Sequence, residues 1–303
     1  MYEMTADSEF PCLQRVSTRL GIPQDRLLRA FAIEREFHRK ILDETDPGKR
    51  KEMYRAVYET VHPIYGNGTS AAGSANPKDR IVRLFARELS GRSILEVGCG
   101  NGLFLQSVAR LLPHGDLVGL DISAPVLPAD VPGIRFILGN IIDFTVAERF
   151  DVVYSEHVIE HIAPADLPAH ISSLISALAA DGVLIISAPN GNFGPSDITR
   201  IMDSSHTGRT RALGTHLHEP THWELMEVLG KHGFDSFRTI FPFMKLRNYL
   251  GFIRFNAKVV AVVERSPLLM RLLHGIRVRG ECLARFDTVL ISRRTGKGKP
   301  VSG

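Results

Sequence analysis

The chain has 303 residues, enough to bury a core and to form one large domain with additions or two small domains. Its hydrophobic content of 44% and charged content of 23% are typical of a soluble globular protein. The net charge of +4 fits an anionic substrate or an acidic membrane surface and is too weak to indicate nucleic-acid binding.

The three cysteines, Cys12, Cys99 and Cys282, are odd in number and widely spaced. They predict neither a disulfide framework nor a C-x-x-C metal site, so we expect a reducing, cytoplasmic location. The first residues show no signal-peptide pattern, and the longest apolar run, Val259–Val263, is too short to span a bilayer.

Residues 1–65 are predicted to be helical because apolar side chains recur at intervals of three and four. The stretch 66–77, GNGTSAAGSANP, contains mainly small and polar residues and predicts a flexible linker or a lid. From residue 78 onward, strands alternate with helices, which predicts an α/β fold with a doubly wound, Rossmann-like parallel sheet. We expect this domain to comprise 78–244 and 286–295, interrupted by a helical insertion at 245–285 and followed by a disordered tail at 296–303.

The first predicted strand runs into a turn with glycines at alternate positions, 98, 100 and 102. Such a turn lets a ligand approach the backbone closely, and the next helix presents its N-terminus to that ligand. The second strand ends in Asp121, which is placed to bind a ribose diol.

The dinucleotide pattern G-x-G-x-x-G would need a glycine at 103, where the chain has Leu103. Glu96, two residues before the first glycine, repels a pyrophosphate but suits an ammonium group. A ligand with a ribose and a positive charge but no phosphate describes S-adenosylmethionine.

The segments LEVGCGNG, LDIS and FDVVYSEHVIEH together resemble the class I S-adenosylmethionine-dependent methyltransferases, in particular the ubiquinone-biosynthesis O-methyltransferase-like group. The resemblance covers about 78–240 and the last strand, and it implies a seven-stranded sheet whose last strand is antiparallel. It also implies a set of cofactor-binding residues. These are Glu96, Gly98, Cys99, Gly100, Asn101, Gly102, Asp121, Ile122, Asn140, Ile141, Ser155 and Glu156. At the position of Asn140, the family often has an aspartate that contacts the adenine amine. For Cys99, the alternative to cofactor binding is a role as a small packing residue.

The fourth strand leads into His157-Val158-Ile159-Glu160-His161, which matches the H-x-x-E-H zinc signature of a metallopeptidase class. That class needs the motif within a longer helix, whereas here it follows a strand end directly, so we reject the peptidase interpretation. In open α/β sheets the ligand lies beyond the carboxyl ends of the strands. His157 and His161 are therefore candidate general bases for removing a proton from a methyl acceptor, and an ordinary helix start remains the alternative for His161.

A second metal interpretation comes from the resemblance. Small-RNA 2′-O-methyltransferases and ubiquinone O-methyltransferases hold magnesium with an E-x-x-E-H arrangement. In this chain the first glutamate of that arrangement falls on His157, and magnesium prefers oxygen ligands. A softer metal would tolerate the exchange better. We expect no metal.

The segment THLHEPTHW supplies two further candidate bases or substrate contacts, His216 and His218, for which surface solvation is the plain alternative. The insertion 245–285 suits a cap over the substrate, a homodimer interface or a peripheral membrane contact. The sequence as a whole predicts O-methylation of a small molecule or sugar with a histidine base. A nucleic-acid 2′-O-methyltransferase and a cofactor-binding module without catalysis are the alternatives.

Overall fold

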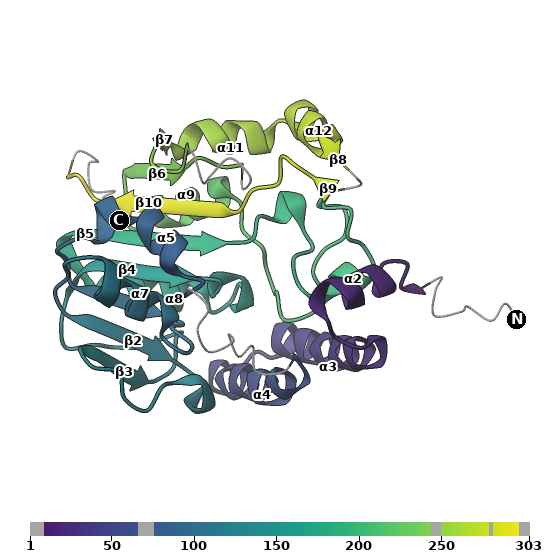
Figure 1. The fold of residues 1–303 in the computed structure, drawn as a ribbon, viewed down its shortest axis with the longest axis horizontal. Helices are drawn as coiled ribbons and strands as arrows, with labels where there is room; N and C mark the ends of the chain where they lie inside the picture. The colour runs from purple at the N-terminus through teal and green to yellow at the C-terminus, as the bar shows by residue number, and fades with distance from the viewer. Residues whose placement is uncertain (1–8, 66–75, 244–249, 279–280, 297–303) are drawn as a thin grey trace, which may run out of the picture.

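The computed structural model describes residues 9–65, 76–243, 250–278 and 281–296. An eight-stranded sheet in the order β3-β2-β1-β4-β5-β10-β6-β7 runs through its centre (Figure 1). Its strands are β1 (Ile94–Val97), β2 (Leu117–Asp121), β3 (Ile134–Leu138), β4 (Phe150–Glu156), β5 (Leu178–Ala188), β6 (Ser236–Ile240), β7 (Arg254–Asn256) and β10 (Thr288–Arg293).

The strand directions confirm the predicted α/β fold. The first five strands pair in parallel, whereas β10 is antiparallel to both β5 and β6. The sheet has eight strands instead of the expected seven, because the additional strand β7 pairs antiparallel with β6 at the sheet edge. This short strand lies within 245–285, for which the sequence indicated helices only.

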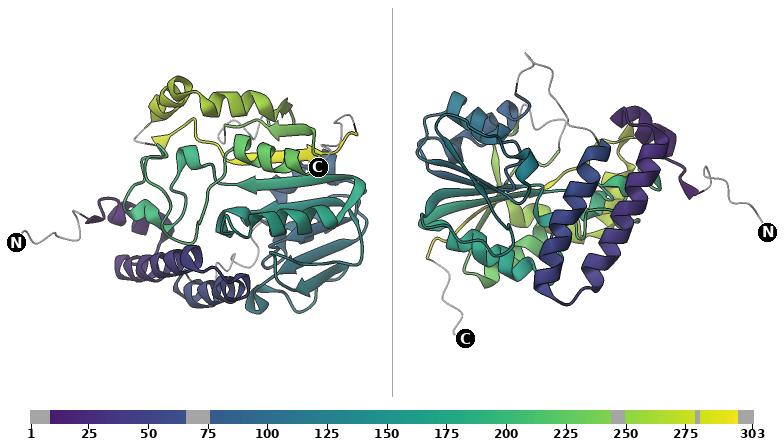
Figure 2. Two further views of the ribbon diagram at one scale, coloured as in Figure 1. Left: turned by 180° about the vertical axis from the view of Figure 1, so that it is seen from behind. Right: turned by 90° about the horizontal axis from the view of Figure 1, so that it is seen from below.

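The helices cover both faces of the sheet (Figure 2), which explains why β1 and β2 are buried along their whole length and carry apolar residues at all positions except Glu96 and Asp121. Side chains alternate between two cores: Val153 packs on one face, and Val152 and Tyr154 pack on the other. The flanking helices are α5 (Asp79–Leu84), α6 (Ala86–Leu89), α7 (Leu103–Leu111), α8 (Leu167–Ser176) and α9 (His222–Lys231), with short 3₁₀ turns η1 (Ala124–Val126), η2 (Ile159–His161), η3 (Gly191–Phe193) and η4 (Ile198–Ile201).

Three N-terminal helices lie together on the side of the molecule opposite α11 and α12 (Figures 1 and 2). They are α2 (Leu13–Leu20), α3 (Gln24–Asp43) and α4 (Pro47–Tyr65). A buried ion pair fastens α4 to the sheet domain, because Arg50 donates from Nε and Nη2 to the two carboxylate oxygens of Asp166 at 2.8 and 2.6 Å. The Tyr54 hydroxyl also donates to Asp166, at 2.8 Å. Of the predicted linker, only residues 76 and 77 are among the described residues, and the predicted tail falls outside them except for residue 296.

The insertion after β6 contains β7, α11 (Ala257–Arg265), α12 (Pro267–Gly275) and a two-stranded ribbon of β8 (Arg277–Val278) and β9 (Glu281–Cys282). Glu264 on α11 points inward, where it binds His222 Nδ1 at 2.7 Å and Asn190 Nδ2 at 2.5 Å. At the other end, Arg254 donates to both carboxylate oxygens of Glu88, at 2.9 and 2.7 Å. Across the described part of the chain, no helix combines the length and hydropathy that crossing a membrane would require.

The ion pair under α4 leads to a stability prediction. Asp166→Ala would leave the Arg50 guanidinium buried without its carboxylate, so we expect the free energy of unfolding to fall by about 3–5 kcal/mol. Urea denaturation followed by circular dichroism measures the change. Glu36→Ala, which removes an exposed partner of Lys40, is the matched control and should leave the midpoint in place. Equal midpoints for both variants would contradict the importance of this contact.

Candidate active site

The turn between β1 and α7 has the backbone that the alternating glycines predicted. Gly98, Gly100 and Gly102 all have positive φ, at 77°, 52° and 70°. A Cβ at Gly98 would lie 2.2 Å from Val158 Cγ2, and one at Gly102 would lie 2.6 Å from the Phe136 ring. At Gly100 a Cβ would meet nothing within 4 Å. The first and third glycines are therefore required by packing, and the second borders open space where a ligand can approach the backbone.

Two buried polar atoms next to this turn have no hydrogen-bond partner among the described residues: Glu96 Oε2 and Ser155 Oγ. They lie on neighbouring strands, because β1 pairs with β4 so that Val97 stands opposite Ser155. Burial, together with the nearby Glu156 carboxylate, raises the pKa of Glu96 well above its usual value. Such groups need a polar ligand, and the ammonium group of S-adenosylmethionine fits the carboxyl of Glu96.

Asp121 is held rigidly at the end of β2. Its Oδ2 accepts from the Gly100 amide at 2.8 Å, and its Oδ1 accepts from the Ser123 amide at 2.9 Å. Each oxygen keeps acceptor capacity for a hydroxyl, as ribose binding requires. Ile122 is buried beside it. Cys99 packs closely against the next strand, since a Cβ on Gly119 would lie 2.7 Å from its Sγ.

The loop after β3 is ordered by its own side chains. Asn140 Oδ1 accepts from the Ile142 amide at 2.8 Å, and its Nδ2 donates to Asp143 at 2.9 Å. No local sequence pattern marks His170 on α8, whose Nδ1–H donates to the Ile141 carbonyl at 2.7 Å. Burial lowers the pKa of His170 to about 4, so this ring stays neutral and positions the loop.

At the mouth of the turn, Asn101 is exposed. Glu156 is already engaged: its Oε2 accepts from Lys78 Nζ at 2.7 Å and from the Tyr154 hydroxyl at 2.9 Å. Lys78 comes from the segment just before α5, so the carboxylate of Glu156 ties the start of the sheet domain to the end of β4.

His157 follows β4 in a left-handed conformation with φ of 55°. Its Nδ1–H donates to Glu160 Oε1 at 3.1 Å, and about half of its side chain, 52%, is exposed. Desolvation by the neighbouring protein acts to lower the pKa of His157, but the bond to the Glu160 carboxylate outweighs it and raises the pKa to about 9. The half-exposed ring therefore favours its protonated form at neutral pH, which makes it a poor proton acceptor.

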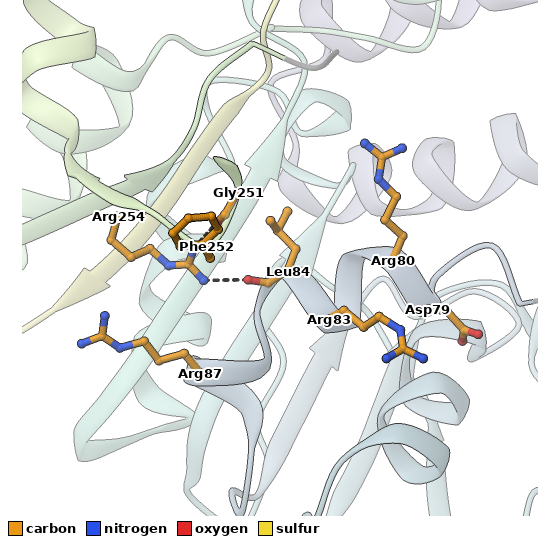
Figure 3. Close-up of a pocket in the computed structure, with 8 residues that line it drawn as sticks. All are labelled: Asp79, Arg80, Arg83, Leu84, Arg87, Gly251, Phe252 and Arg254. Atoms are coloured by element: carbon orange, nitrogen blue, oxygen red, sulfur yellow. Dashed lines mark hydrogen bonds between the residues drawn. The ribbon is translucent and has the colours of Figure 1, made fainter. Parts of the chain in front are cut away.

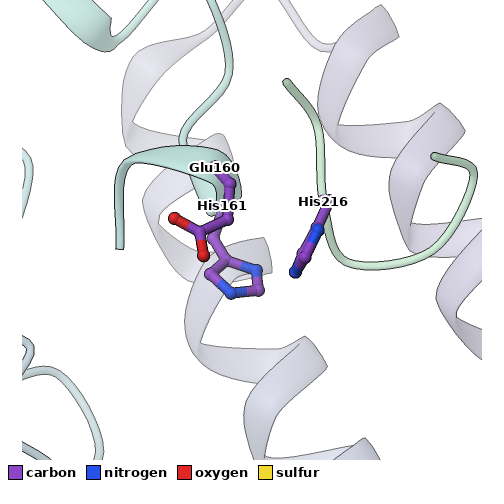
Figure 4. A group of neighbouring side chains, drawn as sticks. All are labelled: Glu160, His161 and His216. Carbon is purple, nitrogen blue, oxygen red and sulfur yellow. The ribbon is translucent and has the colours of Figure 1, made fainter. Parts of the chain in front are cut away.

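Three side chains converge at η2: Glu160 and His161 from the turn itself, and His216 from the loop before α9 (Figure 4). One polar atom from each lies within 4.8 Å of the others. Glu160 is fully buried, and its Oε2 has no hydrogen-bond partner within the described ranges. Two amides, those of Leu217 and His218, donate to the Glu160 carbonyl at 2.7 and 3.2 Å, which fixes the two loops together.

Each imidazole of this cluster is oriented through Nδ1. His161 Nδ1–H donates to the Thr215 carbonyl at 3.0 Å, and His216 Nδ1 binds Glu219 Oε1 at 2.7 Å. Burial and the neighbouring His216 lower the pKa of His161 to about 4. For His216, burial acts in the same direction, but the bond to Glu219 outweighs it and raises the pKa. In both rings Nε2 is left for a proton, a substrate or a metal.

His218 lies apart from this group. Its side chain is 40% exposed, and its Nε2 is 3.7 Å from Glu224 beside the start of α9. There Thr221 and Glu224 form a capping box. The structure thus brings His161 and His216 together and leaves His218 near a helix cap.

A pocket of about 450 Å³ opens beside His216, between the N-terminal helices and the loop around 197–216. Its acidic residues belong to no motif in the sequence. Glu34 accepts from the Tyr65 hydroxyl and, at 3.0 Å, from the Thr215 amide. Burial raises the pKa of Glu34 to about 7. The lining consists of Val16, Leu20, Ile22, Glu34, Tyr58, Val61, Tyr65, Asp197, Ile198, Arg200, Thr215 and His216.

The sheet, the glycine turn and Asp121 together define a Rossmann-like domain that binds a nucleoside cofactor. A family model of a methyltransferase domain matches residues 72–238. A ubiquinone biosynthesis O-methyltransferase of Azorhizobium caulinodans is 31% identical over 174 residues, which are 52% of this chain and 67% of that protein. The mitochondrial ubiquinone biosynthesis O-methyltransferase of Candida albicans is 33% identical over 138 residues, 42% of this chain and 41% of that protein. The match to a Rhodopseudomonas palustris relative covers 58% of its length, so the chain spans about half of these curated relatives.

Among solved structures, the 1,6-didemethyltoxoflavin-N1-methyltransferase of Burkholderia thailandensis has a TM-score of 0.49 at 16% identity, covering 83% of this chain and 92% of its own. A methyltransferase from Archaeoglobus fulgidus has a TM-score of 0.48 at 19% identity, with 73% and 95% covered. On the strength of the family match, the chain belongs to the class I S-adenosylmethionine-dependent methyltransferases.

The buried carboxyl of Glu96 leads to a prediction about cofactor binding. Burial and the nearby Glu156 carboxylate raise the pKa of Glu96 in the empty site, and a bound ammonium group would lower it again, so binding should release protons. Affinity should therefore rise with pH. Glu96→Gln should bind about tenfold more weakly or worse and lose this dependence.

Calorimetry in buffers of different ionisation enthalpy measures both the affinity and the released proton. Asp116→Asn, at an exposed position before β2, is the control. A wild-type affinity that stays constant with pH would rule out this role for Glu96.

Proposed function

We propose that this methyltransferase transfers the cofactor's methyl group to a hydroxyl of a small molecule held in the pocket beside His216. The observation that supports this most directly is the position of His216, which lines the pocket and also belongs to the cluster beyond the β4 end. S-adenosylmethionine, when bound, supplies an electrophilic methyl on a sulfonium. The residues of the chain then have to align the acceptor and remove its proton.

His216 is the best of the four candidate histidines for accepting that proton. Glu219 binds its Nδ1 at 2.7 Å, which leaves Nε2 as the basic nitrogen and stabilises the imidazolium that forms. His157 is protonated at neutral pH, and the lowered pKa of His161 makes that ring a weak base. We assign His157 to orienting Glu160. We assign His161 to supporting the pocket wall, because its ring packs edge-on against that of Tyr58 with 5.7 Å between the ring centroids.

The pocket favours a small molecule over a nucleic acid. Two carboxyl groups, Glu34 and Asp197, line it beside a single arginine, Arg200, so the lining offers a phosphate backbone no excess of positive charge. Most of the remaining lining is apolar or aromatic, which suits a compact acceptor with a hydrophobic body. A sugar or another small hydroxylated molecule therefore fits better than an RNA 3′ end.

A divalent metal is a second candidate for the same cluster, contrary to the expectation from sequence. Glu160 Oε2 lacks a partner within the described ranges, and Nε2 of both His161 and His216 is directed by a bond at Nδ1, as is usual for metal-binding histidines. One carboxylate with two imidazoles suits zinc or a similar transition metal better than magnesium. Such an ion would act as a Lewis acid that lowers the pKa of an acceptor hydroxyl.

The proton-acceptor role leads to a kinetic prediction. His216→Ala should reduce methyl transfer by roughly 10²- to 10⁴-fold while the affinity for S-adenosylmethionine changes little. The wild-type rate should rise with pH as His216 loses its proton. Transfer of labelled methyl to a fractionated metabolite extract measures the rate and also identifies the acceptor.

His218→Ala is the control, because this exposed histidine lies on the same loop outside the cluster. Normal turnover in His216→Ala would refute the assignment. Tight cofactor binding without methylation of any fraction by the wild type would favour a binding module without catalysis.

The metal candidate has its own test. If the cluster binds an ion, purified protein incubated with Zn²⁺ and then desalted should keep about one equivalent by elemental analysis, and His161→Ala should lose it. Co²⁺ would add a visible absorption spectrum typical of nitrogen and oxygen ligands. If the protein retains no metal and keeps full activity in chelator, the metal candidate is excluded and only the proton-acceptor role of His216 remains.

A further inference from the structure

The outer surface of the insertion is unusually apolar. Eight of the twelve exposed large hydrophobic side chains among the described residues fall within 252–278, so they form a concentrated surface rather than the scattered apolar residues of an ordinary exterior. They lie on and around α11 and α12, at the end of the molecule opposite the N-terminal helices (Figures 1 and 2). These residues, here called the insertion surface, are Phe252, Val259, Val262, Leu268, Leu269, Leu272, Ile276 and Val278.

The pattern on α11 separates an inner from an outer face. Ala257, Val260, Ala261 and Glu264 recur at helical spacing and are buried. Val259 and Val262 lie on the opposite side, and their side chains are 62% and 66% exposed. Lys258 and Arg265 are exposed and flank these valines on the helix surface. The core needs only the inner face, so packing does not explain the outer valines.

The next helix repeats this arrangement. Met270 is the one buried residue of α12. Leu268 and Leu272, one turn apart, are 66% and 59% exposed, and Arg271 is exposed beside them. Ile276 continues the apolar surface just after the helix end. Both helices therefore present apolar centres with cationic margins.

The charge of this surface has one sign. Between residues 250 and 278 the only carboxylate is Glu264, which is buried against His222 and Asn190. A pocket of about 740 Å³ adjoins the surface at Phe252, and its lining from α5 and α6 holds three arginines, Arg80, Arg83 and Arg87, and one carboxylate, Asp79 (Figure 3). Exposed apolar groups with an excess of cations are the combination that anionic membrane surfaces bind.

We propose that the insertion surface docks on an anionic lipid bilayer. The valines and leucines enter the boundary between headgroups and acyl chains, and Lys258 and Arg271 contact the lipid phosphates. The Arg265 guanidinium stacks over the Trp223 ring, 4.1 Å from its centroid, and adds positive charge at the margin. A second copy of the chain fits less well, because a symmetric contact would bring these cations together without carboxylates to pair with them. The acceptor pocket lies between other elements, so the surface is not a wall of that pocket.

Co-sedimentation with vesicles tests the proposal on the full-length protein. The wild type should bind vesicles of equal parts phosphatidylglycerol and phosphatidylcholine, bind far less to phosphatidylcholine alone, and detach at high salt. Val262→Asp combined with Leu272→Asp should lower the partition coefficient at least tenfold. Lys258→Ala and Arg271→Ala should each lower it about fivefold.

Leu42→Asp is the matched control, because Leu42 is 44% exposed but lies on α3, away from the insertion surface. Circular dichroism and cofactor binding show whether each variant is folded, and vesicle binding does not depend on which acceptor is methylated. The proposal fails if the wild type does not sediment with anionic vesicles, or if the two aspartate substitutions leave its binding unchanged. A wild-type dimer that Val262→Asp makes monomeric, with no vesicle binding by either protein, would assign the surface to a second copy.

Discussion

The parallel pairing of β1 with β2 and β4 is the constraint on which the site depends. Parallel strands end at the same edge of a sheet, so Glu96, Asp121 and Ser155 meet there although they lie far apart along the chain. The sheet is buried on both faces, and its hydrogen-bond register cannot slip without moving a whole row of apolar side chains to the wrong core. The cofactor-binding groups are therefore rigid before any ligand arrives.

The acceptor side is built differently, from segments that the sheet does not contain. The Arg50–Asp166 pair and the Tyr54 hydroxyl fix α4 on the sheet domain, and Tyr58, on the same helix, lines the pocket. The loop that carries His216 is fixed at Glu160, because the Glu160 carbonyl accepts hydrogen bonds from two backbone amides of this loop, those of Leu217 and His218. The proposed proton acceptor and one wall of the pocket are thus attached near the end of β4 by hydrogen bonds from elements on either side.

The sequence was informative where function depends on local backbone. The glycine turn and Asp121 could be located from spacing alone, because their roles follow from conformation and from position at a strand end. The histidines could not be separated in this way. His216 and His218 are two residues apart, and only the packed loop places one beside His161 and the other near Glu224.

Other features of the site also arise from tertiary contacts. Glu34 reaches Thr215 from a helix about 180 residues earlier, and no local pattern marks it. The three residues of β7 are too few to show a strand period, and they form a strand only because β6 offers an open edge. In each case the sequence does not show which distant segment packs against the residue or strand in question.

The inward orientation of Glu264 connects the two ends of the molecule. This carboxylate holds Asn190, which follows β5 and begins the segment leading to the pocket loop, and its own helix carries Val262 two positions earlier on the outer face. This contact is one of several between the insertion and the same segment, because His274 Nε2 of α12 also bonds the Asn192 carbonyl at 2.8 Å and Phe193 packs against Val260 and Met270. A displacement of the insertion would therefore move the start of the segment that leads from β5 to the loop of the proposed acceptor pocket.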